Sequence, residues 1–216
     1  MRALLFPGQG AQFIGMGKDL ADSSREAMDV FCAVDEALGE KLSNLIWEGN
    51  IEELTLTKNT QPALMATSMA VLAALNANGF EIKTVSYVLG HSLGEYSALA
   101  AVGCLSVADT ARLLRIRGSA MQDATPVGFG AMAAILGLDY EQVSNIVLEL
   151  SKNGLCEIAN DNDPSQVVVS GEKNTVDEVI KKTIKEIREE LGLVSILVNN
   201  AANDESCLLY TSPSPR

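Results

Sequence analysis

The sequence predicts an α/β fold made of two subdomains, and three observations point to it. The 216 residues are 47% hydrophobic and 20% charged, enough apolar material for one sizeable core or two smaller ones. Short apolar runs alternate with helical segments through residues 1–127. Over residues 128–198 the rhythm changes to the order β-α-β-β-α-β, which is that of a ferredoxin-like subdomain.

The first elements each have a local sequence signal. Residues 3–6 form a short apolar run that predicts a buried strand ending in a Pro-Gly-Gln-Gly turn. Ser23 and Glu26 have the spacing of a capping box, which predicts a helix from there to about Leu38.

The next elements lead to a Gly-x-Ser-x-Gly sequence. Pro62 fits the first turn of a helix that is apolar on every side and closes at Gly79, so this helix is expected inside the subdomain. Residues 85–89 predict a buried strand, and a helix over 95–102 follows the Gly-x-Ser-x-Gly sequence directly. Ser106 caps a further helix that extends to about residue 124.

The second subdomain, residues 128–198, is predicted element by element from its patterning. Strands are expected over residues 131–136, 156–159, 166–170 and 194–198, and helices over 141–151 and 175–191. Thr175 and Glu178 predict the cap of the second helix.

The charge of the chain argues against binding to nucleic acid. The net charge of −12 would repel phosphate backbones, so no nucleic-acid partner is expected. The basic cluster of Lys181, Lys182 and Lys185 shares its helix with glutamates and is interpreted as a solvated face.

The four cysteines have neither zinc nor disulfide spacing, so each is interpreted as a small buried hydrophobe and no metal site is predicted. No run of 18 apolar residues occurs, and the apolar run near the start is too short for a signal peptide. We therefore expect a cytoplasmic protein without a membrane partner.

Ser92 is the candidate nucleophile. It lies at the centre of Gly90-His91-Ser92-Leu93-Gly94, between a predicted strand and a predicted helix, as a nucleophile elbow requires. Such a turn exposes the serine Oγ beside the N–H groups of the helix N-terminus, which favour a developing oxyanion. The alternative is a tight strand-helix turn with an incidental serine.

His91 is the only histidine in the chain. Because the residue before the nucleophile leaves the elbow in another direction, its ring is not expected to reach Oγ. We interpret His91 as a packing or positioning residue.

Arg117 is the second candidate. At 100° per residue it falls inside an apolar stripe of the helix that begins at Ser106, whereas Arg112 and Arg115 fall outside it. A buried guanidinium needs an anionic partner, and its planar fork matches a carboxylate. That partner is either a substrate carboxylate or a carboxylate of the protein, and the sequence leaves both open.

Six motifs in order closely resemble those of the bacterial malonyl-CoA:acyl carrier protein transacylase family, over roughly residues 1–180. They are Phe6-Pro-Gly-Gln-Gly-Ala-Gln12, Gln61-Pro-Ala-Leu64, Gly90-His-Ser-Leu-Gly-Glu-Tyr-Ser-Ala-Leu99, Arg117-Gly-x-x-Met-Gln122, Gly130-Ala-Met-Ala-Ala134 and Asn160-x-Asn-x-Pro-x-Gln-Val-Val168. The resemblance implies an α/β-hydrolase-like large subdomain, incomplete here, with the ferredoxin-like subdomain inserted into it.

The resemblance also implies a two-step transfer of a malonyl group. Ser92 would take it from malonyl-CoA as an ester, and the pantetheine thiol of acyl carrier protein would collect it. Gln9 and the N–H of Leu93 would form the oxyanion hole, and Arg117 would bind the malonyl carboxylate. No cofactor is implied beyond the coenzyme A thioester itself. Further family positions near the pocket are Gln61, Asn160 and Asn162.

The chain departs from the family near its end. The family's catalytic histidine lies in a Pro-Val-Ser-x-Pro-x-His segment, but residues 194–204 contain no histidine. This stretch is similar instead to the Asn-Asn-Ala strand end of short-chain dehydrogenases. We interpret residues 187–193 as a junction between unrelated reading frames, and residues 199–216 as a non-native tail. Sequence drift within the family is the alternative.

Three functions therefore compete. A serine esterase shares the elbow but needs no carboxylate clamp at Arg117. A nicotinamide-dependent reductase would need a glycine-rich dinucleotide turn and a Tyr-x-x-x-Lys sequence, and neither is present. Malonyl transfer, by a fatty acid enzyme or by a polyketide synthase acyltransferase domain, accounts for both Ser92 and Arg117. Without a histidine to activate Ser92, the chain by itself is predicted to be inactive.

Overall fold

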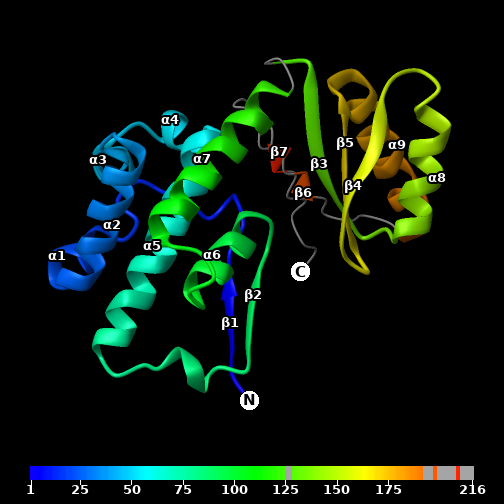
Figure 1. The fold of residues 1–216 in the computed structure, drawn as a ribbon. Helices are drawn as coiled ribbons and strands as arrows, with labels where there is room; N and C mark the ends of the chain where they lie inside the picture. Colours follow the sequence, from blue (N-terminus) through cyan, green and yellow to red (C-terminus); the bar gives the residue numbers. More distant parts are fainter. Residues whose placement is uncertain (125–127, 192–196, 199–207, 210–216) are drawn as a thin grey trace, which may run out of the picture. The chain divides into compact units, whose positions relative to one another are not determined.

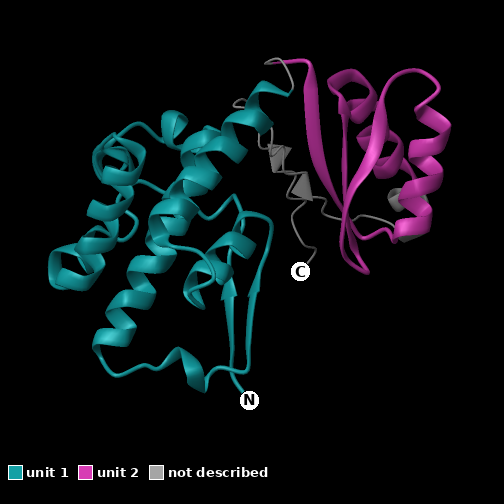
Figure 2. Ribbon diagram, viewed as in Figure 1, with its two compact units in different colours: residues 1–124 teal, residues 125–216 magenta. Residues whose placement is uncertain are grey.

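The computed structural model describes residues 1–124, 128–191, 197–198 and 208–209. The chain divides into two compact units, residues 1–124 and residues 125–216 (Figure 2). The division falls close to the boundary expected after residue 127. Each unit is described by itself.

The sheet of the first unit has two parallel strands, β1 (Ala3–Phe6) and β2 (Tyr87–Gly90), which lie side by side in Figure 1. Strand β2 begins later than predicted, because the 3-10 helix η1 (Ile82–Thr84) closes with a hydrogen bond from the N–H of Val85 to the carbonyl of Ile82. In the parallel register Ala3 faces Tyr87 and Phe6 faces Gly90.

The prediction that both strands are buried is wrong. Leu5 is 74% exposed and its cross-strand neighbour Leu89 is 53% exposed. Alternate residues of a strand point to opposite faces, and the described residues cover only the face of Leu4 and Phe6. Beside β1 an apolar groove of about 330 Å³ includes exposed Phe13 on its rim.

Helices form most of the first unit. They are α1 (Lys18–Ser23), α2 (Arg25–Leu38), α3 (Leu42–Glu48), α4 (Ile51–Thr55), α5 (Thr57–Ala77), α6 (Leu93–Ala101) and α7 (Val107–Asp123). Helix α5 is central, with most of its first half buried, as its all-round apolar sequence predicts. It packs against α2 and α7, and a Cβ added to Gly118 of α7 would lie 2.6 Å from the carbonyl oxygen of Thr57.

Two predicted helix starts are wrong. Ser24 rather than Ser23 caps α2: its backbone is extended and its Oγ accepts the N–H of Ala27 at 3.3 Å. Ser23 ends α1, where its Oγ donates to a backbone carbonyl four residues earlier. Pro62 lies inside α5 rather than in its first turn, because Thr60 Oγ1 donates to the carbonyl of Leu54 at 2.6 Å and ties an earlier start of α5 to α4.

The second unit has the predicted order over its first five elements. These are β3 (Gly130–Leu136), α8 (Tyr140–Leu150), β4 (Cys156–Asp163), β5 (Gln166–Glu172) and α9 (Lys173–Leu191). The strands form an antiparallel sheet in the order β3-β5-β4, and both helices contact it. Its core is mostly valine, isoleucine and alanine from both layers.

The details of this unit differ from the prediction in three places. Helix α8 begins with a capping box of Asp139 and Gln142 that the sequence analysis missed. Helix α9 begins at Lys173, so Thr175 lies within it and is not its cap. Residues 197–198 form β6, which pairs with β7 (Leu208–Leu209) rather than with the three-stranded sheet.

The remainder of the predicted last strand, residues 194–196, lies outside the described residues. So do residues 192–193 of the predicted junction and most of the predicted tail, whereas residues 187–191 of the junction form the end of α9.

The cysteines are not uniformly buried. Cys156 is buried and desolvation raises the pKa of its thiol, but Cys32 and Cys104 are exposed. The prediction is therefore wrong for these two: Cys32 lies on an exposed position of α2, and Cys104 lies in the bend between α6 and α7. Cys207 lies outside the described residues.

Candidate functional site

Ser92 occupies a strained turn between β2 and α6. Its φ is 55° and its ψ is −111°, and among the described residues it is the one non-glycine residue with a positive φ. Such a conformation costs about 1–3 kcal/mol and is concentrated at functional sites. The predicted strand-turn-helix placement of Ser92 is thus what the structure has.

The glycines on either side make this turn possible. A Cβ added to Gly90 would lie 2.0 Å from the carbonyl carbon of Gly94, and one added to Gly94 would lie 2.3 Å from the carbonyl oxygen of Phe6. The backbone of the turn is also fixed, since the N–H of Gly94 donates to the carbonyl of His91 at 2.9 Å. Close packing around the serine therefore requires glycine at both positions.

The elbow also presents a helix N-terminus. Leu93 is the first residue of α6, so its N–H has no acceptor within the helix. The two N–H groups that follow, of Gly94 and Glu95, donate to carbonyls of the turn. The Leu93 N–H thus lies where an oxyanion donor is expected, and its catalytic part remains a prediction.

Gln9 lies in the loop after β1, which crosses the elbow. The N–H of His91 donates to the carbonyl of Phe6 at 3.1 Å, and a Cβ added to Gly8 would lie 2.6 Å from Cδ2 of His91. The loop therefore brings Gln9, which is half-buried, near the turn that carries Ser92. The His91 ring lies against Gly8 although the residue is exposed, and its packing or positioning role stays a prediction.

The guanidinium of Arg117 reaches the nucleophile. Its Nη2 donates to Ser92 Oγ at 3.0 Å and its Nη1 donates to Gln61 Oε1 at 2.7 Å. Its Cζ lies 5.8 Å from the centre of the Tyr96 ring. The structure thus brings Ser92, in the turn before α6, together with Arg117 of α7 and Gln61 of α5. It also adds Tyr96, to which no role was assigned from the sequence.

The partners of Arg117 among the described residues are all neutral. On the same helix Arg112 pairs with Asp109, and Arg115 pairs with Glu40. In the described part of the chain Arg117 has no such ion pair with a carboxylate, which removes the internal salt bridge as its explanation there.

The apolar stripe of α7 is narrower than predicted. Leu113 and Met121 are exposed, whereas Ala111 and Leu114 are buried. Arg117 is half-buried at the edge of this stripe rather than inside it. The difference arises because α7 packs through its small residues, which bring α5 close and leave the longer side chains outside.

Gln61 is 1% exposed, and both ends of its amide are used. Besides the bond to Arg117, its Nε2 lies 3.3 Å from the sulfur of Met121, one turn along α7 from Arg117. The spacing of four residues from Ser92 to Tyr96 and from Arg117 to Met121 is the signal that could have found these two neighbours.

Asn160 and Asn162 belong to the second unit. Both are exposed on β4, and Asn162 Nδ2 donates to Gln166 Oε1 at 3.3 Å. Their proposed contact with substrate stays a prediction.

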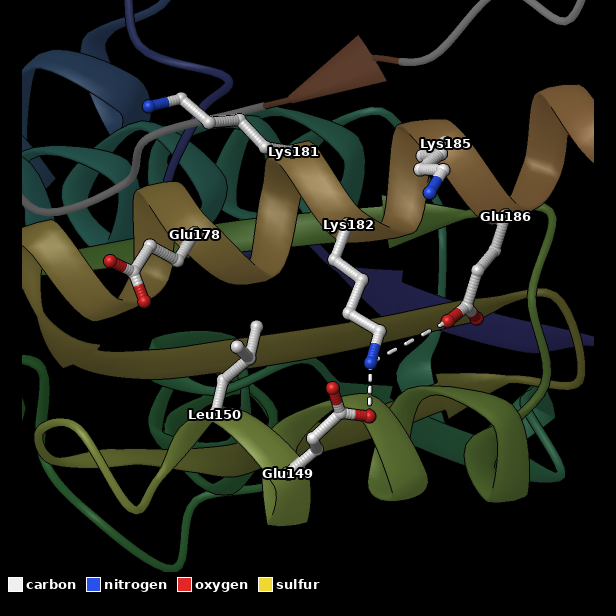
Figure 3. Close-up of a pocket in the computed structure, with 7 residues that line it drawn as sticks. All are labelled: Glu149, Leu150, Glu178, Lys181, Lys182, Lys185 and Glu186. Atoms are coloured by element: carbon white, nitrogen blue, oxygen red, sulfur yellow. Dashed lines mark hydrogen bonds and ion pairs between the residues drawn. The ribbon is translucent and has the colours of Figure 1, made fainter.

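The lysine cluster of α9 lies beside a shallow pocket between α8 and α9 (Figure 3). Lys182 forms ion pairs with Glu149 and with Glu186, which agrees with a solvated, charge-balanced face.

The model of the acyl transferase domain family matches residues 3–205. The chain belongs to this family. Its match extends past the predicted junction at residues 187–193, which stays a prediction. No helix among the described residues is long and apolar enough to cross a membrane.

Within this family the chain is similar to malonyl CoA-acyl carrier protein transacylases. The chain is 51% identical over 170 residues to malonyl CoA-acyl carrier protein transacylase of Bacillus subtilis, covering 78% of this chain and 53% of the relative. It is 42% identical over 182 residues to that of Staphylococcus aureus, covering 83% and 57%. The chain thus spans little more than half the length of these acyl transferase relatives.

Solved structures of malonyltransferases resemble this chain in both sequence and fold. The acyl-carrier-protein S-malonyltransferase of Bartonella henselae is 52% identical with a TM-score of 0.82, covering 86% of this chain and 60% of that one. A malonyl-transacylase in complex with a type II polyketide acyl carrier protein is 38% identical with a TM-score of 0.80, covering 85% and 59%. The likeness confirms the predicted α/β-hydrolase-like and ferredoxin-like fold class.

Proposed function

We propose that this acyl transferase chain carries the nucleophile half of a malonyl-CoA:acyl carrier protein transacylase. The observation that carries the proposal is the 3.0 Å contact between Arg117 Nη2 and Ser92 Oγ. An acyl group esterified to Ser92 would meet a guanidinium that no carboxylate of the described residues neutralises. The free carboxylate of a malonyl group, one methylene beyond the ester carbon, matches that position. A plain esterase would have no use for it.

The chemistry would proceed in two transfers. Ser92 Oγ attacks the thioester carbon of malonyl-CoA, the C–S bond breaks, and coenzyme A leaves as the thiol that receives the serine proton. The pantetheine thiol of acyl carrier protein then attacks the ester and restores the serine hydroxyl. Leu93 N–H and Gln9 would stabilise each oxyanion, and Asn160 and Asn162 would contact substrate. No cofactor is needed beyond the thioester.

Proton transfer needs a base, and the described site offers none. A serine hydroxyl is a weak nucleophile near neutral pH without a neighbouring base. His91 is the chain's only histidine, and its ring lies against Gly8. We therefore assign turnover to this chain only when it is completed by the remaining length of its relatives.

The partner in the second transfer is an acyl carrier protein, which the named relatives and the transacylase–carrier complex support. Nucleic acid and membrane have no part in this reaction. A cytoplasmic location belongs to the same proposal and is supported by the free thiols of Cys32, Cys104 and Cys156, since disulfides are rare in reducing compartments.

The test is acylation of Ser92. The chain is fused to the C-terminal part of the Bacillus subtilis relative, incubated with malonyl-CoA and analysed by intact-mass spectrometry and peptide mapping. One malonyl group on Ser92, absent from Ser92→Ala and far scarcer with acetyl-CoA, supports the proposal. Equal labelling by malonyl-CoA and acetyl-CoA contradicts malonyl selectivity and favours a general acyl transferase or esterase.

A further inference from the structure

The Gln61 amide lies at the junction between α5 and the guanidinium of Arg117. We propose that Gln61 is a specificity-determining residue: it contacts Arg117 with a neutral amide, and this neutrality keeps the positive charge available to the carboxylate of the acyl group. The inference rests on the proposed malonyl transfer and goes beyond it by assigning the selectivity of the clamp to a residue that touches Arg117.

The amide can act in this way because it is fixed. Gln61 is 1% exposed within the buried part of α5, and α7 approaches α5 closely at Gly118, next to Arg117 in the chain. Its Nε2 lies 3.3 Å from Met121 sulfur, so its Oε1 faces Arg117 Nη1 at 2.7 Å. Only the oxygen can accept from a guanidinium, which fixes the orientation of the amide.

The charge balance separates Gln61 from a glutamate at the same place. Elsewhere on α7, Arg112 and Arg115 are paired with carboxylates. A glutamate at position 61 would have nearly the same shape and would accept the same hydrogen bond, but it would also neutralise Arg117. An incoming malonyl carboxylate would then face a neutral pair and the repulsion of a buried anion.

The remaining contacts set the direction of approach. The Tyr96 ring lies near the guanidinium at 5.8 Å, and Ser92 Oγ occupies one N–H of Nη2 at 3.0 Å. Because carboxylates bind guanidinium in its plane through paired hydrogen bonds, the acyl carboxylate would approach on the edge shared with Ser92. Neutralising the guanidinium charge of Arg117 should weaken the binding of acyl groups that bear a carboxylate and leave the binding of other acyl groups unchanged.

The experiment measures dissociation constants of malonyl-CoA and acetyl-CoA for the purified 216-residue chain by isothermal titration calorimetry. The two ligands differ only in the carboxylate. In Gln61→Glu we expect malonyl-CoA to bind about a hundredfold more weakly and acetyl-CoA to change less than threefold. In Gln61→Met, which removes the hydrogen bond but adds no charge, the preference for malonyl-CoA should persist.

The outcomes separate the inference from the proposed function. Equal binding of both ligands by the unmodified chain would refute malonyl selectivity itself. A malonyl preference that survives Gln61→Glu, or losses of the same factor for both ligands, would leave that function standing and refute the role of Gln61. Loss of the preference in Gln61→Met would also refute it, since neutrality would then not suffice.

A second pair covers the case in which Gln61→Glu does not fold. Met121 is 48% exposed and touches Gln61, so a carboxylate there approaches Arg117 from the solvent side with little risk to packing. Met121→Glu should weaken malonyl-CoA binding about tenfold, and Met121→Gln should not. An unchanged malonyl preference in Met121→Glu would then refute the inference, with circular dichroism verifying that each variant is folded.

Discussion

Replacing Arg117 by alanine removes the charge that the proposed reaction depends on. The guanidinium is half-buried and donates to Ser92 and Gln61, so its loss takes away both the partner of the acyl carboxylate and the contact at the nucleophile. Removing one member of a buried charge pair costs about 3–5 kcal/mol. Malonyl transfer should therefore fall on the order of a hundredfold to several thousandfold, since each 1.4 kcal/mol is about tenfold.

The assay compares kcat/KM for malonyl-CoA and acetyl-CoA in the chain completed with the C-terminal part of the Bacillus subtilis relative. Acetyl transfer should change less than tenfold, because the acetyl group offers no carboxylate. Arg117→Lys is the matched control: it keeps the charge and loses the planar fork, so its loss of malonyl transfer should be intermediate. Equal losses for the two acyl groups in Arg117→Ala would show that Arg117 is structural.

A stability control belongs to the same experiment. Truncating Arg117 leaves the Oε1 of Gln61, a 1% exposed residue, without its donor, which costs about 1–3 kcal/mol of folding free energy. Urea denaturation of Arg117→Ala and of Arg117→Ala with Gln61→Met separates this term. The double variant should recover part of the stability without recovering malonyl transfer.

Three further outcomes are expected. The 216-residue chain alone should turn over essentially no malonyl-CoA in a coupled thiol-release assay, and His91→Ala should change nothing; turnover abolished by that substitution would make His91 the base. Asp35 is buried and accepts from both the N–H and the hydroxyl of one serine, so Asp35→Ala should lower the free energy of unfolding by about 1–3 kcal/mol in urea, while exposed Glu36→Ala changes it little. Iodoacetamide should modify exposed Cys32 quickly and Cys156, whose pKa is raised by burial, only after unfolding; equal rates by peptide mapping would contradict the burial.

Local chemistry made much of this fold predictable. The glycines around Ser92 and the cap at Ser106 depend on residues within a few positions of each other, and the structure has both where the sequence placed them. The predicted cap at Ser23 was wrong for the opposite reason, since Ser24 is the residue that caps α2. Both are good caps, and the choice depended on α1 ending at Ser23, which carries no strong local signal.

In the site, too, features set by the local sequence could be predicted and features set by helix packing could not. Helical periodicity singled out Arg117, but its contact with the amide of Gln61 depends on α5 packing against α7 at Gly118 and could not be predicted. Tyr96 is one turn beyond Ser92, and only the crossing of the helices shows that its ring meets Arg117. Burial of the strands was mispredicted because an apolar strand carries the same sequence pattern whether or not its second face is covered.

The short sheet has a consequence for motion. Two strands of four residues, open on the face of Leu5 and Leu89, have little stability of their own. The elbow is therefore anchored mainly by α6 and by α5 and α7, which pack against α6. We expect that β1 and β2 can open locally while α5 and α7 stay folded. Arg117 and Gln61 would keep their positions during such an opening. Ser92 lies between the opening strand β2 and the folded helix α6, so it would move relative to them.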